Sequence, residues 1–237
     1  MPMSQLTVII SGGFSKSYRQ LLPEFESSTR IAVTTLSGAS QGKGPETIAA
    51  QLSRGARVDV VILSREGLSE LIAEGRIVAG SDVDLARAAL GAAIRSGTRR
   101  PVIDTVAAFK HALLSAKVVA VPASTSGIYL VEDLFPRLGI ADKLNIKMTP
   151  RGSQSAALVA AGDADIAVQP ISELLRESGL DYLGRIPAEL QLIQTFSAAI
   201  VAGSKEVEAS RRLIAYLASE RAATAISING MEPVMGR

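Results

Sequence analysis

Apolar runs of strand length alternate with segments of helical spacing along the first third of the chain. The first run, residues 6–10, ends at Ser11-Gly12-Gly13, and apolar residues then recur at the three- and four-residue spacing of a helix. Further runs at residues 31–36 and 58–63 are predicted as strands, each with a helix after it. We therefore predict a repeated strand–helix unit whose third strand is covered on both faces, because it is almost continuously apolar.

The pattern changes near Asp84. Residues 85–94 are small and apolar, and they fit a strand or a helix equally well. A second α/β set follows, with strands predicted at 118–121, 146–149 and 166–168 and a long one at 191–201. The two long segments are the natural crossings between two lobes. We expect an α/β protein with lobe one formed by residues 1–84 plus 202–237 and lobe two by residues 85–201.

Turn and cap residues set the predicted helix boundaries. Pro23 indicates a break or kink within the helix expected over 14–26. Pro45-Glu46 is predicted to begin a helix after a long polar loop, and Asp104 to cap a helix that extends to Lys117. The helices expected nearer the C-terminus span 128–138, 152–161, 205–217 and 220–228.

Composition narrows the class of protein. A hydrophobic fraction of 47% with 20% charged residues is typical of a globular protein. The net charge of +2 is spread along the chain and there is no Trp, so nucleic acid is not an expected partner. No apolar run approaches the roughly 20 residues that span a bilayer. The start of the chain lacks a signal peptide, which as written predicts a cytoplasmic protein, or a periplasmic one if a mature form was trimmed.

The absence of cysteine excludes disulfides, thiolate nucleophiles and iron–sulfur clusters, and a single histidine leaves little basis for a transition-metal site. His111 is expected on a solvated helix face. We therefore expect neither a metal nor a cofactor.

Glycine- and serine-containing corners recur where predicted strands meet helices, at residues 11–13, 37–40, 64–65, 124–127, 151–154 and 169–172. At the first, Gly12 and Gly13 let an anion approach the unpaired amides that begin the helix. In a parallel sheet such corners open on the same edge, so together they predict an anion site. The candidate ligand-binding residues are Ser11, Gly12, Gly13, Ser40, Arg65, Ser126, Gly127, Arg151, Gln154 and Gln169.

Several charged and hydroxyl side chains lie near these corners and have structural alternatives. Arg65 either contacts a ligand or forms a surface ion pair with Glu66 or Glu70. Tyr129 either reaches the site or packs in the core with a satisfied hydroxyl. If the protein has a catalytic base, Tyr129, Lys43 and Glu46 are the candidates by location. The structural alternative for Lys43 is a solvated side chain on its loop.

These segments resemble the type II periplasmic-binding-protein fold and, within it, the molybdate-binding-protein-like family of extracellular solute-binding proteins. The resemblance covers essentially the whole chain and rests on Ser11-Gly12-Gly13-Phe14, residues 57–62, Ser126-Gly127-Ile128-Tyr129, residues 162–167 and residues 196–200. It implies a ligand held between two lobes by loops at helix N-termini. An ABC permease would be a partner if the protein is exported.

The resemblance leaves three functions open. Lys43, Arg65 and Arg151 depart from the neutral donors of molybdate and tungstate binders, and guanidinium groups match carboxylates, which favours a di- or tricarboxylate ligand. The family also resembles aconitate isomerase, which moves an allylic proton without a cofactor. A molybdate- or tungstate-type oxyanion binder is the remaining alternative.

Overall fold

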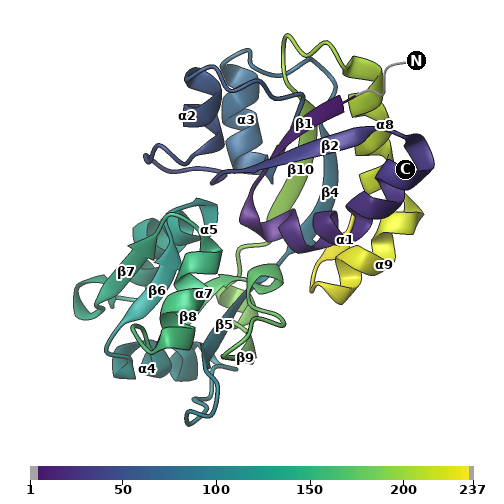
Figure 1. Cartoon of the computed structure of the whole chain (residues 1–237). Coiled ribbons are helices and arrows are strands. Elements are labelled where there is room, and N and C mark those ends of the chain that lie inside the picture. The colour runs from purple at the N-terminus through teal and green to yellow at the C-terminus, as the bar shows by residue number, and fades with distance from the viewer. Residues whose placement is uncertain (1–4, 235–237) are drawn as a thin grey trace. The chain divides into compact units, whose positions relative to one another are not determined.

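The computed structural model describes residues 5–234, and the chain divides into two compact units. Unit 1 comprises the residues up to Arg87 together with those from Thr195 onward, and unit 2 comprises Ala88–Gln194. The sequence prediction placed these crossings at 84–85 and 201–202. Each unit has its own mixed sheet with helices packed on it, which confirms the α/β prediction (Figure 1).

Unit 1 is built on a six-stranded sheet in the order β11-β4-β10-β3-β1-β2. Strands β1, β2 and β3 run parallel to one another, whereas β10 is antiparallel to β3 and β11 is antiparallel to β4. The strands are β1 (Gln5–Ile10), β2 (Ala32–Ser37), β3 (Val60–Ser64), β4 (Val83–Ala88), β10 (Gln194–Ile200) and β11 (Glu232–Pro233). The helices are α1 (Gly12–Thr29), α2 (Ile48–Ser53), α3 (Arg65–Ala73), α8 (Val207–Leu217) and α9 (Glu220–Ile228).

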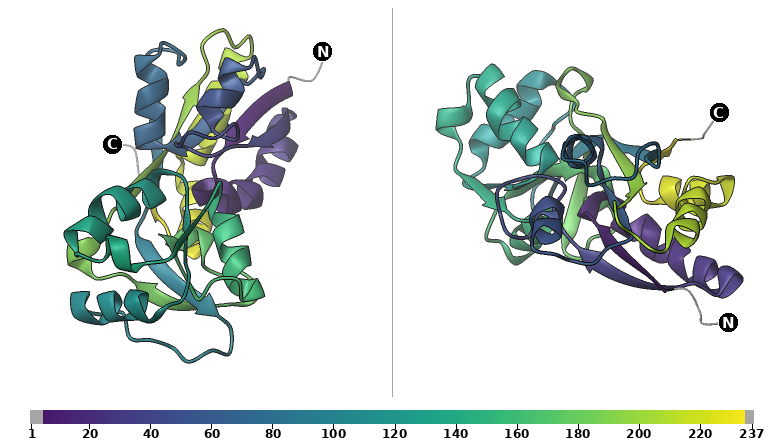
Figure 2. Two further views of the ribbon diagram at one scale, coloured as in Figure 1. Left: turned by 90° about the vertical axis from the view of Figure 1, so that its left-hand side faces the viewer. Right: turned by 90° about the horizontal axis from the view of Figure 1, so that it is seen from above.

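Helices cover both faces of this sheet, which explains why β3 is apolar at successive positions. Figures 1 and 2 show α2 and α3 on one side and α1, α8 and α9 on the other. Alternate residues such as Ile9, Val61 and Leu63 pack in the cluster under α2 and α3. Phe14 and Tyr18 of α1 are fully buried.

Unit 2 has a five-stranded sheet in the order β7-β6-β8-β5-β9, with β6, β7 and β8 parallel. The strands are β5 (Leu90–Arg95), β6 (Val119–Pro122), β7 (Ile146–Thr149), β8 (Ile166–Pro170) and β9 (Leu180–Arg185). The helical segments are α4 (Val106–Ser115), α5 (Thr125–Ile128), a π-helix (Tyr129–Leu134), α6 (Phe135–Arg137), α7 (Gly152–Ala161) and short 3-10 turns at Ala141–Lys143, Ile171–Glu173 and Ala188–Leu190.

The two faces of the unit 2 sheet carry side chains of different size. Val119, Val121 and Val168 pack in the larger cluster with α4 and the π-helix. The intervening residues Ala120 and Ala167 face α7 instead. Small residues on that face let α7 pack close to the strands.

Several predicted boundaries are wrong for identifiable reasons. Helix α1 continues through Pro23, which is exposed and forfeits a single backbone hydrogen bond. Thr105, not Asp104, caps α4, because its hydroxyl accepts the Ala108 amide at 3.1 Å. Residues 83–95 form two strands, β4 and β5, in place of one long element. Strand β9 was missed altogether.

The strand predicted over 191–201 begins later, at Gln194, and Gln191 is instead held through its side chain. Its Oε1 accepts from Leu90 N at 2.8 Å and its Nε2 donates to Leu90 O at 2.9 Å. Nε2 also donates to Ile186 O at 2.8 Å. The side-chain amide of Gln191 therefore joins its own segment to β5 at Leu90 and to the residue after β9, Ile186.

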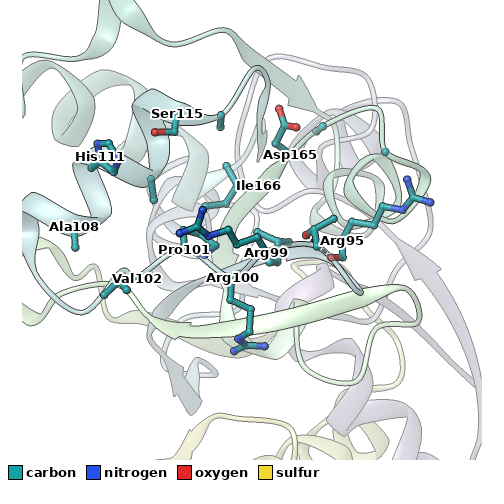
Figure 3. Close-up of a pocket in the computed structure, with 16 residues that line it drawn as sticks. Arg95, Arg99, Arg100, Pro101, Val102, Ala108, His111, Ser115, Asp165 and Ile166 are labelled. Atoms are coloured by element: carbon teal, nitrogen blue, oxygen red, sulfur yellow. Dashed lines mark hydrogen bonds between the residues drawn. The ribbon is translucent and has the colours of Figure 1, made fainter.

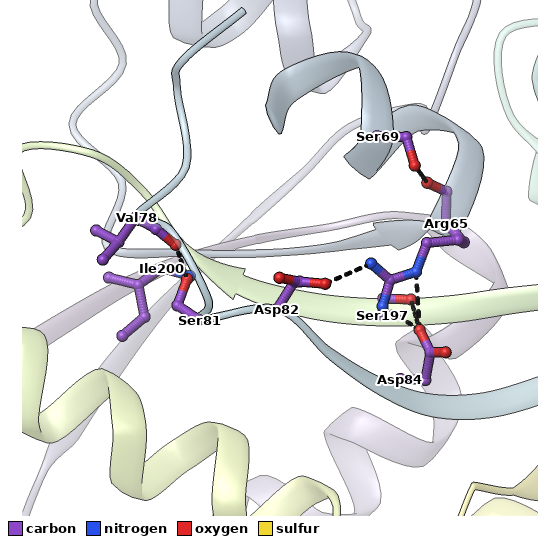
Figure 4. Close-up of polar contacts among 8 residues, drawn as sticks. All are labelled: Arg65, Ser69, Val78, Ser81, Asp82, Asp84, Ser197 and Ile200. Carbon is purple, nitrogen blue, oxygen red and sulfur yellow. Dashed lines mark hydrogen bonds and ion pairs between the residues drawn. The ribbon is translucent and has the colours of Figure 1, made fainter. Parts of the chain in front are cut away.

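Arg65, the first residue of α3, lies in a polar network with β4 and β10 (Figure 4). Its guanidinium pairs with Asp84 and with Asp82, the latter at 2.7 Å. Ser197 Oγ donates to Asp84 Oδ1 at 2.6 Å. Burial alone would raise the pKa of Asp84, but the hydrogen bond from Ser197 and the pairing with Arg65 outweigh it, so this pKa lies below its ordinary value.

We predict that Gln191→Leu lowers the unfolding free energy by about 1–3 kcal/mol, because it leaves the Leu90 and Ile186 backbone groups without this partner. Urea unfolding would measure the loss. Ile193→Ala, which truncates a side chain that is 51% exposed, is the control and should change little. Equal stability of the two variants would contradict the role of the amide.

We also predict that Asp84→Asn lowers stability near neutral pH by about 1 kcal/mol, a modest effect because water screens a pair in which Arg65 and Asp84 are 30% and 36% exposed. Since the folded pKa of Asp84 is depressed, its stabilisation is complete above the unfolded value of about 3.9 and is lost as pH falls through the folded pKa. The difference between variant and wild type in urea unfolding should therefore shrink on acidification. Asp104→Asn, an exposed carboxylate, should show no such difference at any pH.

Candidate functional site

The three predicted corners of unit 1 lie together at the carboxyl edge of β1, β2 and β3. Ser11 N donates to Ile62 O at 2.8 Å, and Gly38 N donates to Ile10 O at 3.1 Å. The third corner joins them through Ser64 N, which donates to Ser40 Oγ at 2.9 Å. Parallel pairing thus collects these loops at one edge.

The N-terminus of helix α1 lies at this edge. Ser11 precedes the helix and is 4% exposed, and its Oγ has no hydrogen-bond partner among the described residues. A Cβ at Gly13 would lie 1.9 Å from Phe196 Cζ, so a side chain there would displace a buried ring. The first amides of the helix and its dipole favour negative charge beside this hydroxyl.

The loop between β2 and α2 carries Ser40, Lys43 and Glu46. Ser40 is buried, and its Oγ already accepts the Ser64 amide. Lys43 is exposed and Glu46 is half-buried. The prediction that Pro45-Glu46 begins the helix is wrong: Thr47 caps it by accepting the Ala50 amide at 3.2 Å.

Arg65 lies at the third corner, but its guanidinium pairs inside unit 1. The partners are Asp82 and Asp84, so the surface pairing considered with Glu66 or Glu70 is wrong. Two carboxylates therefore balance the positive charge of Arg65 in this structure.

Unit 2 gathers its corners in the same way, at the carboxyl edge of β6, β7 and β8. Ala123 N donates to Thr149 O at 2.6 Å, which joins the first two. Ser126 is 3% exposed in α5. A Cβ at Gly127 would lie 1.6 Å from the Pro122 carbonyl oxygen, so this position requires glycine.

At the start of α7 the protein places its own carboxylate. A Cβ at Gly152 would lie 2.5 Å from Glu173 Oε2, so glycine leaves room for Glu173 beside the helix N-terminus. Gln154 is exposed, and its Oε1 accepts the Arg151 amide at 3.1 Å. Arg151 itself is half-buried. Sequence reasoning missed Glu173 because nothing local to residues 171–173 indicates contact with α7.

The third corner of unit 2 contains two buried polar side chains with unsatisfied atoms. Gln169 is fully buried; its Nε2 donates to Glu173 O at 3.4 Å, and its Oε1 has no partner among the described residues. Ser172 is 1% exposed, and its Oγ likewise has no partner there. Leaving a buried polar group unpaired costs about 1–3 kcal/mol, so such groups mark a place for a ligand or water.

Tyr129, the first residue of the π-helix, is satisfied within unit 2. Its hydroxyl donates to Leu190 O at 3.0 Å and accepts from Arg137 Nη2 at 3.2 Å. Its ring packs against the larger core cluster. These contacts match the structural alternative considered from the sequence.

Within residues 5–234, no group of three His, Cys, Asp or Glu side chains could hold a metal ion. In the same described range, no helix is long and apolar enough to cross a membrane.

Comparison with known proteins identifies close and distant relatives. A curated aconitate isomerase from Pseudomonas sp is 37% identical over 235 residues, covering 98% of this chain and 89% of that protein. The periplasmic molybdate-binding protein of Azotobacter vinelandii superposes with a TM-score of 0.71 at 18% identity, covering 98% and 100% of the two chains. The sulfate-binding protein SubI from Mycobacterium tuberculosis H37Rv gives a TM-score of 0.75 at 16% identity, covering 98% and 87%.

The two solved structures share the two-lobed periplasmic-binding-protein fold with this chain, which confirms the fold expected from the sequence. The model of the family described as bacterial extracellular solute-binding protein matches residues 6–232. The chain therefore belongs to the bacterial extracellular solute-binding protein family.

Proposed function

We propose that the protein binds a small anion, a di- or tricarboxylate, through the helix N-termini and buried polar groups at the carboxyl edges of its two sheets. The observation that supports this most directly is the set of unsatisfied atoms Ser11 Oγ, Gln169 Oε1 and Ser172 Oγ. Hydroxyl groups donate to carboxylate oxygens, and the α1 amides beside Ser11 add donors without a counter-charge. Either orientation of the Gln169 amide leaves one polar atom for a ligand.

The identity to aconitate isomerase favours a second, catalytic function on the same groups. A base would remove a proton from the carbon between a carboxylate and the double bond of trans-aconitate. The electron pair would shift the double bond, and the protonated base, after exchange with solvent, would deliver a proton to the other end of the three-carbon unit to give cis-aconitate. Substrate and product are isomers, so the step balances without an oxidant, a reductant or a cofactor.

Four side chains are candidates for the base. Lys43 is exposed on its loop, and Glu46 is half-buried beside it. Tyr129 would have to release the Leu190 carbonyl, which makes it the weakest candidate. We add Glu173, because its carboxylate lies beside Gly152 at the N-terminus of α7, and its backbone carbonyl accepts from Gln169 Nε2.

A specific observation also supports the oxyanion alternative. Because Asp82 and Asp84 neutralise Arg65, the unit 1 corners present uncharged hydroxyl and amide donors, with exposed Lys43 as the remaining cation on these loops. Such donors suit molybdate or tungstate as the resemblance implies. Partnership with an ABC permease would apply to a binding protein that is exported.

Proton NMR of the purified protein with trans-aconitate in deuterated buffer tests these proposals together. We expect cis-aconitate to appear with solvent deuterium at the allylic carbon if the protein is an isomerase. Binding of citrate-like acids without turnover would support a binding protein, and binding of molybdate alone would overturn the carboxylate proposal. Single substitutions at Lys43, Glu46, Tyr129 and Glu173 would then identify the base, whose removal abolishes exchange and leaves binding measurable.

The binding groups are tested by calorimetry. Ser11→Ala should lower the affinity for the anion by a factor of about ten or more, because it removes a donor from a buried charge-assisted contact. The matched control is Ser27→Ala on the same helix; Ser27 is exposed and its Oγ donates to Glu24 O. If the two variants bind alike, Ser11 is not a ligand contact.

A further inference from the structure

A pocket of about 660 Å³ lies in unit 2, away from the corners described above. Strand β5 is antiparallel to β8, so the end of β5 meets the start of β8, and Ile94 pairs with Ile166. The corner residue Gln169 lies at the other end of β8, opposite Gly91. The pocket is therefore at the opposite edge of the sheet from the unit 2 corners.

The lining combines an apolar surface with positively charged side chains. Ile94, Val102, Ala112, Ala164 and Ile166 supply apolar surface. Figure 3 labels the charged and hydroxyl side chains of the lining, which come from the end of β5 and the loop after it, from α4 and from the residue before β8: Arg95, Arg99, Arg100, His111, Ser115 and Asp165.

The loop after β5 is held in place by hydrogen bonds. Asp181 on β9 accepts from Ser96 Oγ at 3.0 Å and from Gly97 N at 3.3 Å. Thr98 Oγ1 donates to Arg95 O at 2.7 Å, which closes the turn. A fixed loop presents its side chains with little ordering cost on binding.

The three arginines differ in their surroundings. Arg100 Nη2 donates to the Tyr182 carbonyl at 2.8 Å. Arg95 lies beside Gly162, the C-cap of α7, where a Cβ would be 3.0 Å from Arg95 Nη1; a cation at a helix C-terminus complements the helix dipole. Arg99 has neither an ion pair nor a side-chain hydrogen bond with any residue that the structure describes.

Arg99 forms no ion pair with Asp165, the acidic residue of the lining, within the part of the chain that the structure describes. Asp165 Oδ2 accepts the Val118 amide at 2.8 Å. In Figure 3 Arg95 and Arg100 point away from the other labelled side chains, whereas Arg99 lies among them. The basic charge available to a bound molecule is therefore that of Arg99.

We infer that this pocket is a second binding site, which takes a small organic anion with an apolar body. Arg99 pairs with the anionic group, Ser115 offers a hydroxyl, and the apolar residues of the lining cover the rest of the molecule. The volume is in the range of sites for small organic ligands. This inference is independent of what binds at the corners.

The test is an amide NMR titration of the full chain with naphthalene-1-sulfonate, and with 1-naphthalenemethanol as its neutral analogue. We expect saturable shifts in residues 94–102, 108–116 and 162–166. Arg99→Ala should weaken sulfonate binding about tenfold or more and leave the neutral analogue unchanged, because a charge-assisted contact is lost. Arg212→Ala, an exposed arginine of α8 in unit 1, is the matched control.

Equal sulfonate affinity in wild type and Arg99→Ala would overturn the inference, as would shifts confined to other regions or the absence of saturable binding. Arg99 is exposed, so its variant should keep the melting temperature of the wild type. A negative result in this titration would not contradict the proposed anion site at the corners, since that site is tested with different ligands and variants.

Discussion

Parallel strand pairing is the constraint on which the candidate site depends. In each unit three parallel strands end at one edge, and the polypeptide must turn there before each following segment begins. Hydrogen bonds between successive turns, such as Ser11 N to Ile62 O and Ala123 N to Thr149 O, follow directly from this arrangement. Polar groups far apart in sequence are thereby concentrated without any dedicated binding domain.

The corners could be predicted because each lies at the end of a predicted strand. Contacts between residues far apart in the sequence could not be predicted. The spans of α7 and α9 follow from local spacing and turn residues, whereas α1 begins at Gly12, two residues before the predicted start at Phe14. The network of Arg65 with Asp82 and Asp84 joins residues whose proximity is set by how β4 is placed in the sheet, so no sequence pattern near Arg65 reveals it. The carboxylate of Glu173 beside Gly152 was missed for the same reason.

Charge content gave a less reliable guide to chemistry than hydrogen-bond satisfaction. From the sequence, Arg65 supported a carboxylate ligand; in the structure its charge is balanced internally. The unsatisfied oxygens of Ser11, Gln169 and Ser172 are uncharged, yet they carry the stronger argument. The sequence pattern selects Ser11 and Gln169 by their position at strand ends, but not Ser172. A buried polar atom without a partner is informative because folding alone gives no reason to leave it so.

The alanine face of the unit 2 sheet also has an evolutionary consequence. At Ala93, Ala120 and Ala167, facing α7, nearly every substitution adds volume, so change there would push the helix outward. On the opposite face, residues such as Val121 and Val168 can be exchanged for side chains of similar volume with compensation from neighbours. Among related sequences, substitutions should therefore accumulate slowly on the face of this sheet toward α7 and faster on the face toward α4. The position of α7 relative to the sheet should vary less than the side chains of the core beneath α4.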